Sequence, residues 1–179
     1  MKLIKLTALS LTLFMSVSSL VSCEPDEELK KTTDYSKTGI VLTGAQETPA
    51  VPSTGKGSMD VFYSKASKTL SYTVNWSDLA DSVTAMHIHG LSPVGFASGI
   101  VQHIISGVGT SSGTNGAQFS AQRVNPGPLR FSKTGTISGT LLVDGAVIKE
   151  ADLLNGFYYM NIHSKTYTGG EIRGQIVFQ

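Results

Sequence analysis

The stretch Thr69-Leu-Ser-Tyr-Thr-Val-Asn-Trp76 predicts a β-strand. Its alternate positions are apolar and would share one face of an extended strand: Leu70, Tyr72, Val74 and Trp76. An alternation of this length is typical of a strand that covers a core on one side and meets water on the other. We therefore expect a β-sheet around it.

Similar short runs, separated by Gly, Pro, Asn, Asp and Ser, continue on both sides of this stretch. They predict further strands near residues 39–43, 57–63, 83–89, 100–105, 117–123, 135–143, 157–163 and 171–178. One short helix is expected over 147–154, because Asp144-Gly145 forms a turn before it and Asn155-Gly156 ends it. The pattern predicts an all-β antiparallel β-sandwich with one short helix.

The composition alone excludes some classes of protein. The 179 residues include 14 Lys and Arg against 13 Asp and Glu, a formal net charge of +1. That balance gives no electrostatic basis for binding nucleic acid. A single cysteine excludes an intramolecular disulfide, and a hydrophobic content of 40% is enough to form a core.

The first 22 residues have the form of a targeting segment. Lys2 and Lys5 precede a mostly apolar stretch that is too short and too rich in Ser and Thr for a membrane-spanning helix. It ends in Leu20-Val21-Ser22-Cys23, which resembles a bacterial lipobox. The resemblance implies that residues 1–22 are a lipoprotein signal peptide and that Cys23 carries the lipid. We therefore expect a protein anchored to the membrane of the bacterial cell envelope, at the periplasmic or surface face of the outer membrane.

Residues 23–37 are acidic and almost without apolar side chains. Such a composition cannot bury surface, so we expect a flexible tether before a folded domain over 38–179. The acidic run Glu24, Asp26, Glu27 and Glu28 has two interpretations. It is either a solvated spacer or, by resemblance to lipoproteins of the Bacteroidetes type, a signal for export to the cell surface.

Three motifs follow in a specific order within that domain. They are Leu-Thr-Gly-Ala-Gln-Glu-Thr-Pro-Ala-Val at 42–51, Ala-Met-His-Ile-His-Gly at 85–90, and Gly-Phe-Tyr-Tyr-Met-Asn-Ile-His-Ser at 156–164 with Gly-Gly-Glu-Ile-Arg-Gly-Gln-Ile at 169–176. Together they resemble the CHRD domain, first named from chordin and also found in bacterial envelope proteins. The resemblance implies a β-sandwich outside the cytoplasm and no settled biochemical activity.

The same motifs contain the polar residues that are candidates for structural or binding roles: Gln46, Glu47, Asn161, Glu171 and Arg173. Glu171 and Arg173 lie two apart on the last predicted strand, either as an exposed ion pair that recognises a partner or as a structural pair. Gln46 and Glu47 are expected in an edge strand or loop, where Pro49 would limit further pairing.

All four histidines lie on predicted strands. His87 and His89 are two apart and therefore share a face, as Asn161 and His163 do, while His103 occupies a third strand. Imidazole is a common ligand for copper and zinc, so converging rings could bind either ion. The alternative is a hydrogen-bonded polar cluster of His87, His89, Asn161 and His163 that stabilises two strands.

The spacing of the histidines is also similar to that of Cu/Zn superoxide dismutase, whose fold is an antiparallel Greek-key sandwich related in form to immunoglobulin domains. That resemblance implies that His87, His89 and His163 are copper ligands and that His103 takes the place of the metal-bridging histidine. The chain has no further histidines for a zinc site. The resemblance therefore supports metal binding more than redox turnover.

No catalytic signature accompanies these residues. The sequence contains no nucleophile elbow, phosphate-binding loop or dinucleotide fingerprint. We therefore predict a non-catalytic binding or structural module with an unidentified protein or glycan partner in the envelope. The alternative is a copper or zinc protein that uses the histidines.

Overall fold

The computed structural model describes residues 34–105 and 132–179. In these ranges the chain forms eight β-strands, one turn of 3-10 helix and one short α-helix. In chain order they are β1 (Tyr35–Thr43), η1 (Gly44–Gln46), β2 (Lys56–Ser64), β3 (Thr69–Ser77), β4 (Val83–Gly90), β5 (Ile100–Ile105), β6 (Gly135–Leu142), α1 (Glu150–Leu154), β7 (Tyr158–Ser164) and β8 (Ile172–Gln175). None of the described helices is long and apolar enough to cross a bilayer.

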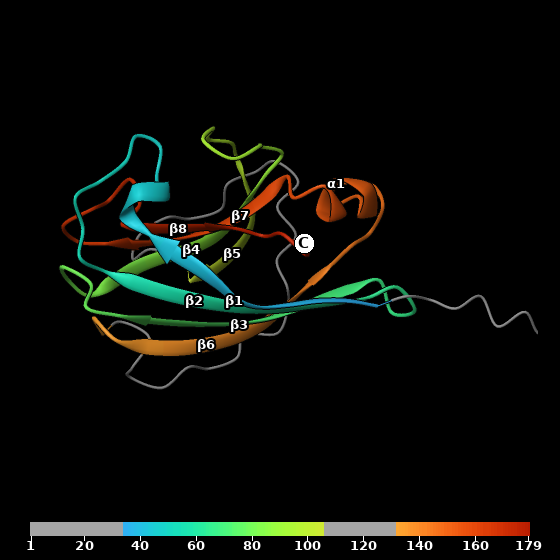
Figure 1. Ribbon diagram of the computed structural model, residues 1–179, viewed down its shortest axis with the longest axis horizontal. Coiled ribbons are helices and arrows are strands. Elements are labelled where there is room, and N and C mark those ends of the chain that lie inside the picture. The colour runs from blue at the N-terminus through green and yellow to red at the C-terminus, as the bar shows by residue number, and fades with distance from the viewer. Residues whose placement is uncertain (1–33, 106–131) are drawn as a thin grey trace, which may run out of the picture. The chain divides into compact units, whose positions relative to one another are not determined.

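All the strand pairs are antiparallel, and the strands form one sheet in the order β5-β4-β7-β8-β1-β2-β3-β6. Strands β1 and β8 meet through the single pair Thr43 and Arg173, whereas β2 and β3 pair along their full length. The sheet therefore divides into two four-stranded layers, β1-β2-β3-β6 and β5-β4-β7-β8, which Figure 1 shows above one another. This is the all-β sandwich that the sequence predicts.

One buried side chain links the two ends of the sheet. Gln102 on β5 is fully buried, and its Nε2 donates to the Thr140 carbonyl on β6 at 2.7 Å. Its Oε1 accepts from the Tyr72 hydroxyl on β3 at 3.2 Å. Because β5 and β6 are the terminal strands of the sheet, this amide nearly closes it into a barrel.

The apolar core lies between the two layers. The predicted face of β3 supplies part of it, since Leu70, Tyr72, Val74 and Trp76 are all at most 4% exposed. The facing layer contributes the side chains that alternate with its polar residues: Met86, Ile88, Met160, Ile162 and Ile172. The core-facing positions were therefore correctly predicted from the period of two along each strand.

Some boundaries differ from the predictions. Strand β1 begins at Tyr35, so residues 35–37, which we assigned to the tether, belong to the sheet. Helix α1 begins at Glu150 instead of 147, because Asp144 Oδ1 accepts from the backbone N–H groups of residues 146, 147 and 148 and holds them in a turn. The predicted strand at 117–123 lies outside the described residues.

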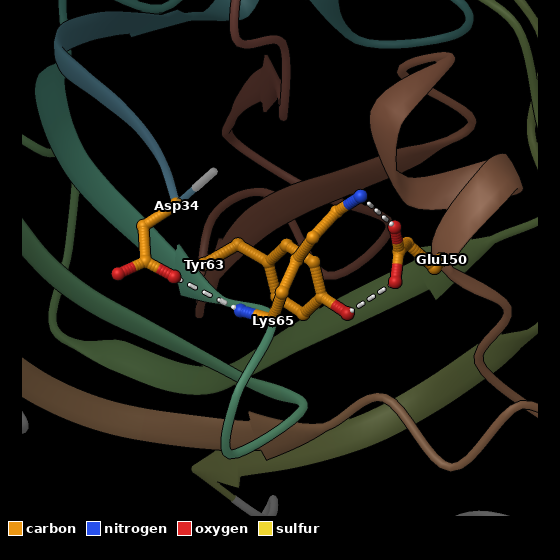
Figure 2. A network of polar contacts seen from close by, with 4 residues as sticks. All are labelled: Asp34, Tyr63, Lys65 and Glu150. Carbon is orange, nitrogen blue, oxygen red and sulfur yellow. Dashed lines mark hydrogen bonds and ion pairs between the residues drawn. The ribbon is translucent and has the colours of Figure 1, made fainter. Parts of the chain in front are cut away.

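The start of β1 is fixed to the rest of the domain by a polar network (Figure 2). Asp34 Oδ1 accepts from the Lys65 backbone N–H at 3.1 Å, where the chain leaves β2. The Lys65 ammonium pairs with Glu150 on α1 at 2.9 Å, and the Tyr63 hydroxyl donates to the same carboxylate at 2.9 Å. The network joins the first described residues to the β2–β3 hairpin and to the helix.

Candidate functional site

The layer β5-β4-β7-β8 is unusual because two of its strands are buried on both faces. Every residue of β8, and all of β7 except the half-buried His163, is buried. One face contributes to the apolar core. On the other face the segments around Glu47 and Ser98 cover a second layer that is polar, with His87, His89, Asn161, Arg173 and Gln175 at most 9% exposed.

Three histidines converge in this polar layer. His87 lies directly opposite Asn161 in the β4–β7 register, which sets the ring of His163 beside that of His87. His87 Nδ1 and His163 Nε2 are 3.1 Å apart, and one ring nitrogen from each of His87, His89 and His163 lies within 4.8 Å of the others. The spacing of two along β4 and β7 produces this convergence, as the sequence predicted.

The outer nitrogens of two rings are held by backbone carbonyls. His89 Nδ1 lies 2.9 Å from the Ser98 carbonyl oxygen, and His163 Nδ1 lies 2.9 Å from the Thr168 carbonyl oxygen. A carbonyl oxygen only accepts, so each Nδ1 carries the proton of a neutral ring. Both Nε2 atoms are then unprotonated and direct their lone pairs into the cluster, which is the tautomer that a metal-binding histidine requires.

Asn161 lies between the two inward-facing lone pairs. Its Oδ1 is 3.1 Å from His89 Nε2 and 3.1 Å from His163 Nε2, while its amide group hydrogen-bonds to Glu47. In this orientation three acceptors face one another with no proton between Asn161 and either ring, and a cation would relieve the repulsion. The opposite amide orientation would place N–H donors toward both rings and give the closed polar cluster that is the alternative interpretation.

Burial keeps the rings neutral. Burial, reinforced by the neighbouring histidines, lowers the pKa of His87 to about 3. Burial also lowers the pKa of His89 and that of His163, although the hydrogen bonds to Ser98 and Thr168 oppose the effect. The lone pairs therefore remain available to a metal ion at neutral pH.

His103 lies at the border of this group. It is the cross-strand partner of His87 in the β4–β5 register, and the two rings are perpendicular with centroids 4.8 Å apart. It is half-buried, whereas His87 is buried. The structure thus places the fourth histidine beside the cluster, on the edge strand.

An aromatic stack connects the cluster to the charged part of the polar layer. The Tyr159 ring is parallel to the His89 ring, with centroids 4.8 Å apart, and the Arg173 guanidinium lies 3.4 Å from the centroid of Tyr159. Arg173 also donates to Thr48 Oγ1 at 3.4 Å and to Gln175 Oε1 at 3.1 Å. The Tyr159 ring therefore lies between the buried Arg173 cation and the His89 ring.

Glu47 interacts electrostatically with Arg173. Burial raises the pKa of Glu47 to about 7, although Arg173 and the hydrogen bond from Asn161 oppose the rise. Gly170 has a φ of +129°, and a Cβ there would lie 2.5 Å from Glu47 Oε1, so only glycine leaves room for this carboxyl group.

Two of the predicted site residues lie elsewhere. Gln46 Nε2 donates to the Val41 carbonyl at 2.8 Å and supports the local turn. Glu171 is fully buried, and its Oε1 accepts from Ser53 Oγ at 2.7 Å and from the Ala80 N–H at 2.6 Å. The exposed Glu171–Arg173 pair that we considered is therefore wrong, because both side chains are buried and their described contacts go to different partners. Cys23 lies outside the described residues.

The donor set fits copper or zinc, with some movement of the rings. Imidazole nitrogen is a good ligand for both ions, and a metal–nitrogen bond of about 2.0–2.1 Å separates tetrahedral ligands by about 3.4 Å. His87 and His163 are already slightly closer than this, at 3.1 Å. The most distant pair, at no more than 4.8 Å, would need to approach by about 1.4 Å.

The residues that orient the histidine rings and Arg173 were not singled out from the sequence. Tyr159 and Gln175 were detectable in principle, since each lies two positions from a predicted site residue on the same strand face. Ser98 and Thr168 contribute only carbonyl oxygens to the rings, so their side chains carry no signal of that role.

Comparison with known proteins identifies one family. The family model of the CHRD domain matches residues 38–176, which is most of the chain and includes every described residue of the histidine cluster. No curated protein and no solved structure matches the chain.

Proposed function

Because the chain belongs to the CHRD domain family, we propose that it is a non-catalytic module of the bacterial cell envelope, lipid-anchored through Cys23, whose histidine cluster binds one copper or zinc ion. His87, His89 and His163 are the ligands, and His103 is placed to join them. The bound ion would supply a local positive charge and a fixed link between β4 and β7.

One observation carries the metal proposal. The backbone carbonyls of Ser98 and Thr168 take the outer N–H groups of two rings, so both Nε2 lone pairs face the same point. Outer hydrogen bonds of this kind fix the tautomer of metal-binding histidines in general. Asn161 Oδ1 faces both nitrogens and donates to neither, and His87 Nδ1, 3.1 Å from His163 Nε2, is a ring nitrogen that can donate into the cluster. A bound ion would replace that hydrogen bond.

Metal loading tests this proposal. We expect purified, tag-free protein to retain about one equivalent of Cu or Zn after loading and dialysis, and its melting temperature to rise with metal concentration. His89→Ala and His163→Ala should lose both effects. Retention of less than about a tenth of an equivalent by the wild-type protein would contradict metal binding and support the polar cluster.

His103→Ala is the matched comparison, since it removes an imidazole next to the ligands without removing one of the three converging nitrogens. We expect it to retain the ion with lower affinity. A loss of metal as complete as in His163→Ala would make His103 an essential ligand, and no change would remove it from the site.

The anchor has an independent test. We expect Cys23→Ser to abolish acyl labelling and to release the protein from the membrane fraction, because lipid chains provide about 0.8 kcal/mol per buried CH₂. If the variant stayed membrane-bound and acylated, the anchor would have been assigned to the wrong residue. This outcome would leave the metal proposal intact.

A further inference from the structure

The loop between β4 and β5 exposes a cluster of large apolar side chains. Leu91, Val94 and Phe96 are 54%, 70% and 65% exposed and lie within six residues. No Asp, Glu, Lys or Arg occurs from residue 90 to residue 102. Single exposed apolar residues are common, but a local group of them without charge marks an interaction surface.

The backbone of this loop is held in shape by hydrogen bonds. The Ser92 N–H donates to the Phe157 carbonyl at 2.8 Å, and the Ser92 hydroxyl donates to the Phe96 carbonyl at 2.6 Å. Gln175 Nε2 donates to the Ser92 carbonyl at 2.8 Å. The three apolar side chains are therefore displayed by an ordered loop, which reduces the entropy cost of binding a surface.

The register places this loop at the end of the domain from which the N-terminal segment departs. Gly90, where β4 ends, lies opposite Tyr158, and β8 finishes beside that pair. The chain beyond β8 leads to Phe178, whose ring contacts Tyr35 with centroids 6.0 Å apart. Figure 1 shows the yellow-green loop after β4 projecting at the top of the view.

We propose that the loop Leu91–Phe96 inserts its apolar side chains into the surface of a lipid bilayer. The inference rests on the proposed lipidation of Cys23. Only ten residues separate Cys23 from Asp34, so the anchor keeps the start of β1 within about 40 Å of the bilayer. Confinement at this distance gives a high effective concentration, and a small apolar loop that would bind weakly alone can then remain inserted.

The loop suits lipid better than a polar partner. Its largest exposed side chains have no hydrogen-bonding groups, and the Ser92 hydroxyl is already bonded to the Phe96 carbonyl. The Lys65 ammonium on the β2–β3 hairpin is already paired with Glu150 at 2.9 Å, so the apolar side chains of the loop carry the attraction to lipid.

The test places a probe on the loop of the lipidated protein. Val94→Cys is labelled with an environment-sensitive fluorophore and reconstituted into vesicles that contain anionic and brominated lipids. Val41→Cys, at a site 57% exposed on β1, is the matched control. We expect a blue shift at position 94 and quenching at least about twofold greater than at position 41. Leu91→Ser combined with Phe96→Ser should reduce the quenching at position 94 to the control level.

The labelling ratio separates this inference from the anchor on which it rests. Cys23 is the only native cysteine, and lipidation blocks its thiol, so the anchored variant binds one fluorophore. Two fluorophores per chain would show that the anchor is absent, and both proposals would then fail. One fluorophore with equal quenching at positions 94 and 41 would overturn the inserted loop alone.

Discussion

The two layers of the sandwich use the same strand period for different purposes. In β3 the buried apolar residues alternate with positions that are half-buried or exposed. In β7 both faces are buried, and the second face carries Tyr159, Asn161 and the half-buried His163. The comparison shows that a polar face of a strand can be buried when loops cover it. The covered polar face of β7 is also where the candidate metal-binding residues lie.

Removing the buried cation should be the strongest disturbance of the covered face. Arg173→Ala deletes the hydrogen bonds to Thr48 and Gln175 and the contact with Tyr159. We expect the free energy of unfolding to fall by about 3–5 kcal/mol, measured by denaturant titration. Asn75→Ala, on the exposed face of β3, is the control and should change it by less than about 0.5 kcal/mol. Equal losses of stability in the two variants would contradict the difference in burial between the two layers.

Glu47 should make the stability of the metal-free protein depend on pH. Burial raises its pKa from 4.5 to about 7, so the folded state favours the protonated form. That contribution is present at low pH and is lost as the pH rises through 7, for a total of about 3 kcal/mol. Arg173, Asn161 and the Thr48 backbone are the groups that interact with this carboxyl, and all three oppose the rise.

The measurement is the difference in unfolding free energy between wild type and Glu47→Gln from pH 4 to pH 8. Because the histidines titrate in both proteins, this difference isolates Glu47. We expect the variant to gain stability relative to wild type as the pH rises. Parallel curves would mean that Glu47 is not buried as described.

A smaller loss of stability is expected at Gly170, where the backbone contacts Glu47. Gly170→Ala introduces a Cβ that would lie 2.5 Å from Glu47 Oε1, at a φ of +129°. We expect a loss of about 1–3 kcal/mol, measured by thermal unfolding. Gly169→Ala is the matched control, because a Cβ there has no neighbour within 4 Å. A similar loss in both variants would attribute the effect to the loop backbone rather than to contact with Glu47.

The smallest effect is predicted on the open layer. Thr73 and Ser138 share a hydrogen bond of 2.8 Å on the exposed face of β3 and β6. Thr73→Ala should change the free energy of unfolding by less than about 0.5 kcal/mol, since water replaces the lost partner. A loss above 1 kcal/mol would show that this face is also covered.

The sequence was most informative where a local rule determines structure. Alternation in β3 predicted its buried face, and the spacing of His87 and His89 placed both rings on one side of β4. It failed for two physical reasons. The burial of Glu171 depends on Ser53 and Ala80, which are distant in the chain. The tautomers of His89 and His163 depend on the backbone carbonyls of Ser98 and Thr168, which are near in the chain but carry no side-chain signal of that role.

The most direct test of the central claim is X-ray absorption spectroscopy of the copper- or zinc-loaded protein, compared with His163→Ala. The account predicts a shell of nitrogen ligands at about 2.0–2.1 Å with the outer-shell scattering of at least three imidazole rings, and its loss in the variant. A loaded wild-type protein whose spectrum contains no imidazole scattering, or is unchanged by His163→Ala, would contradict it.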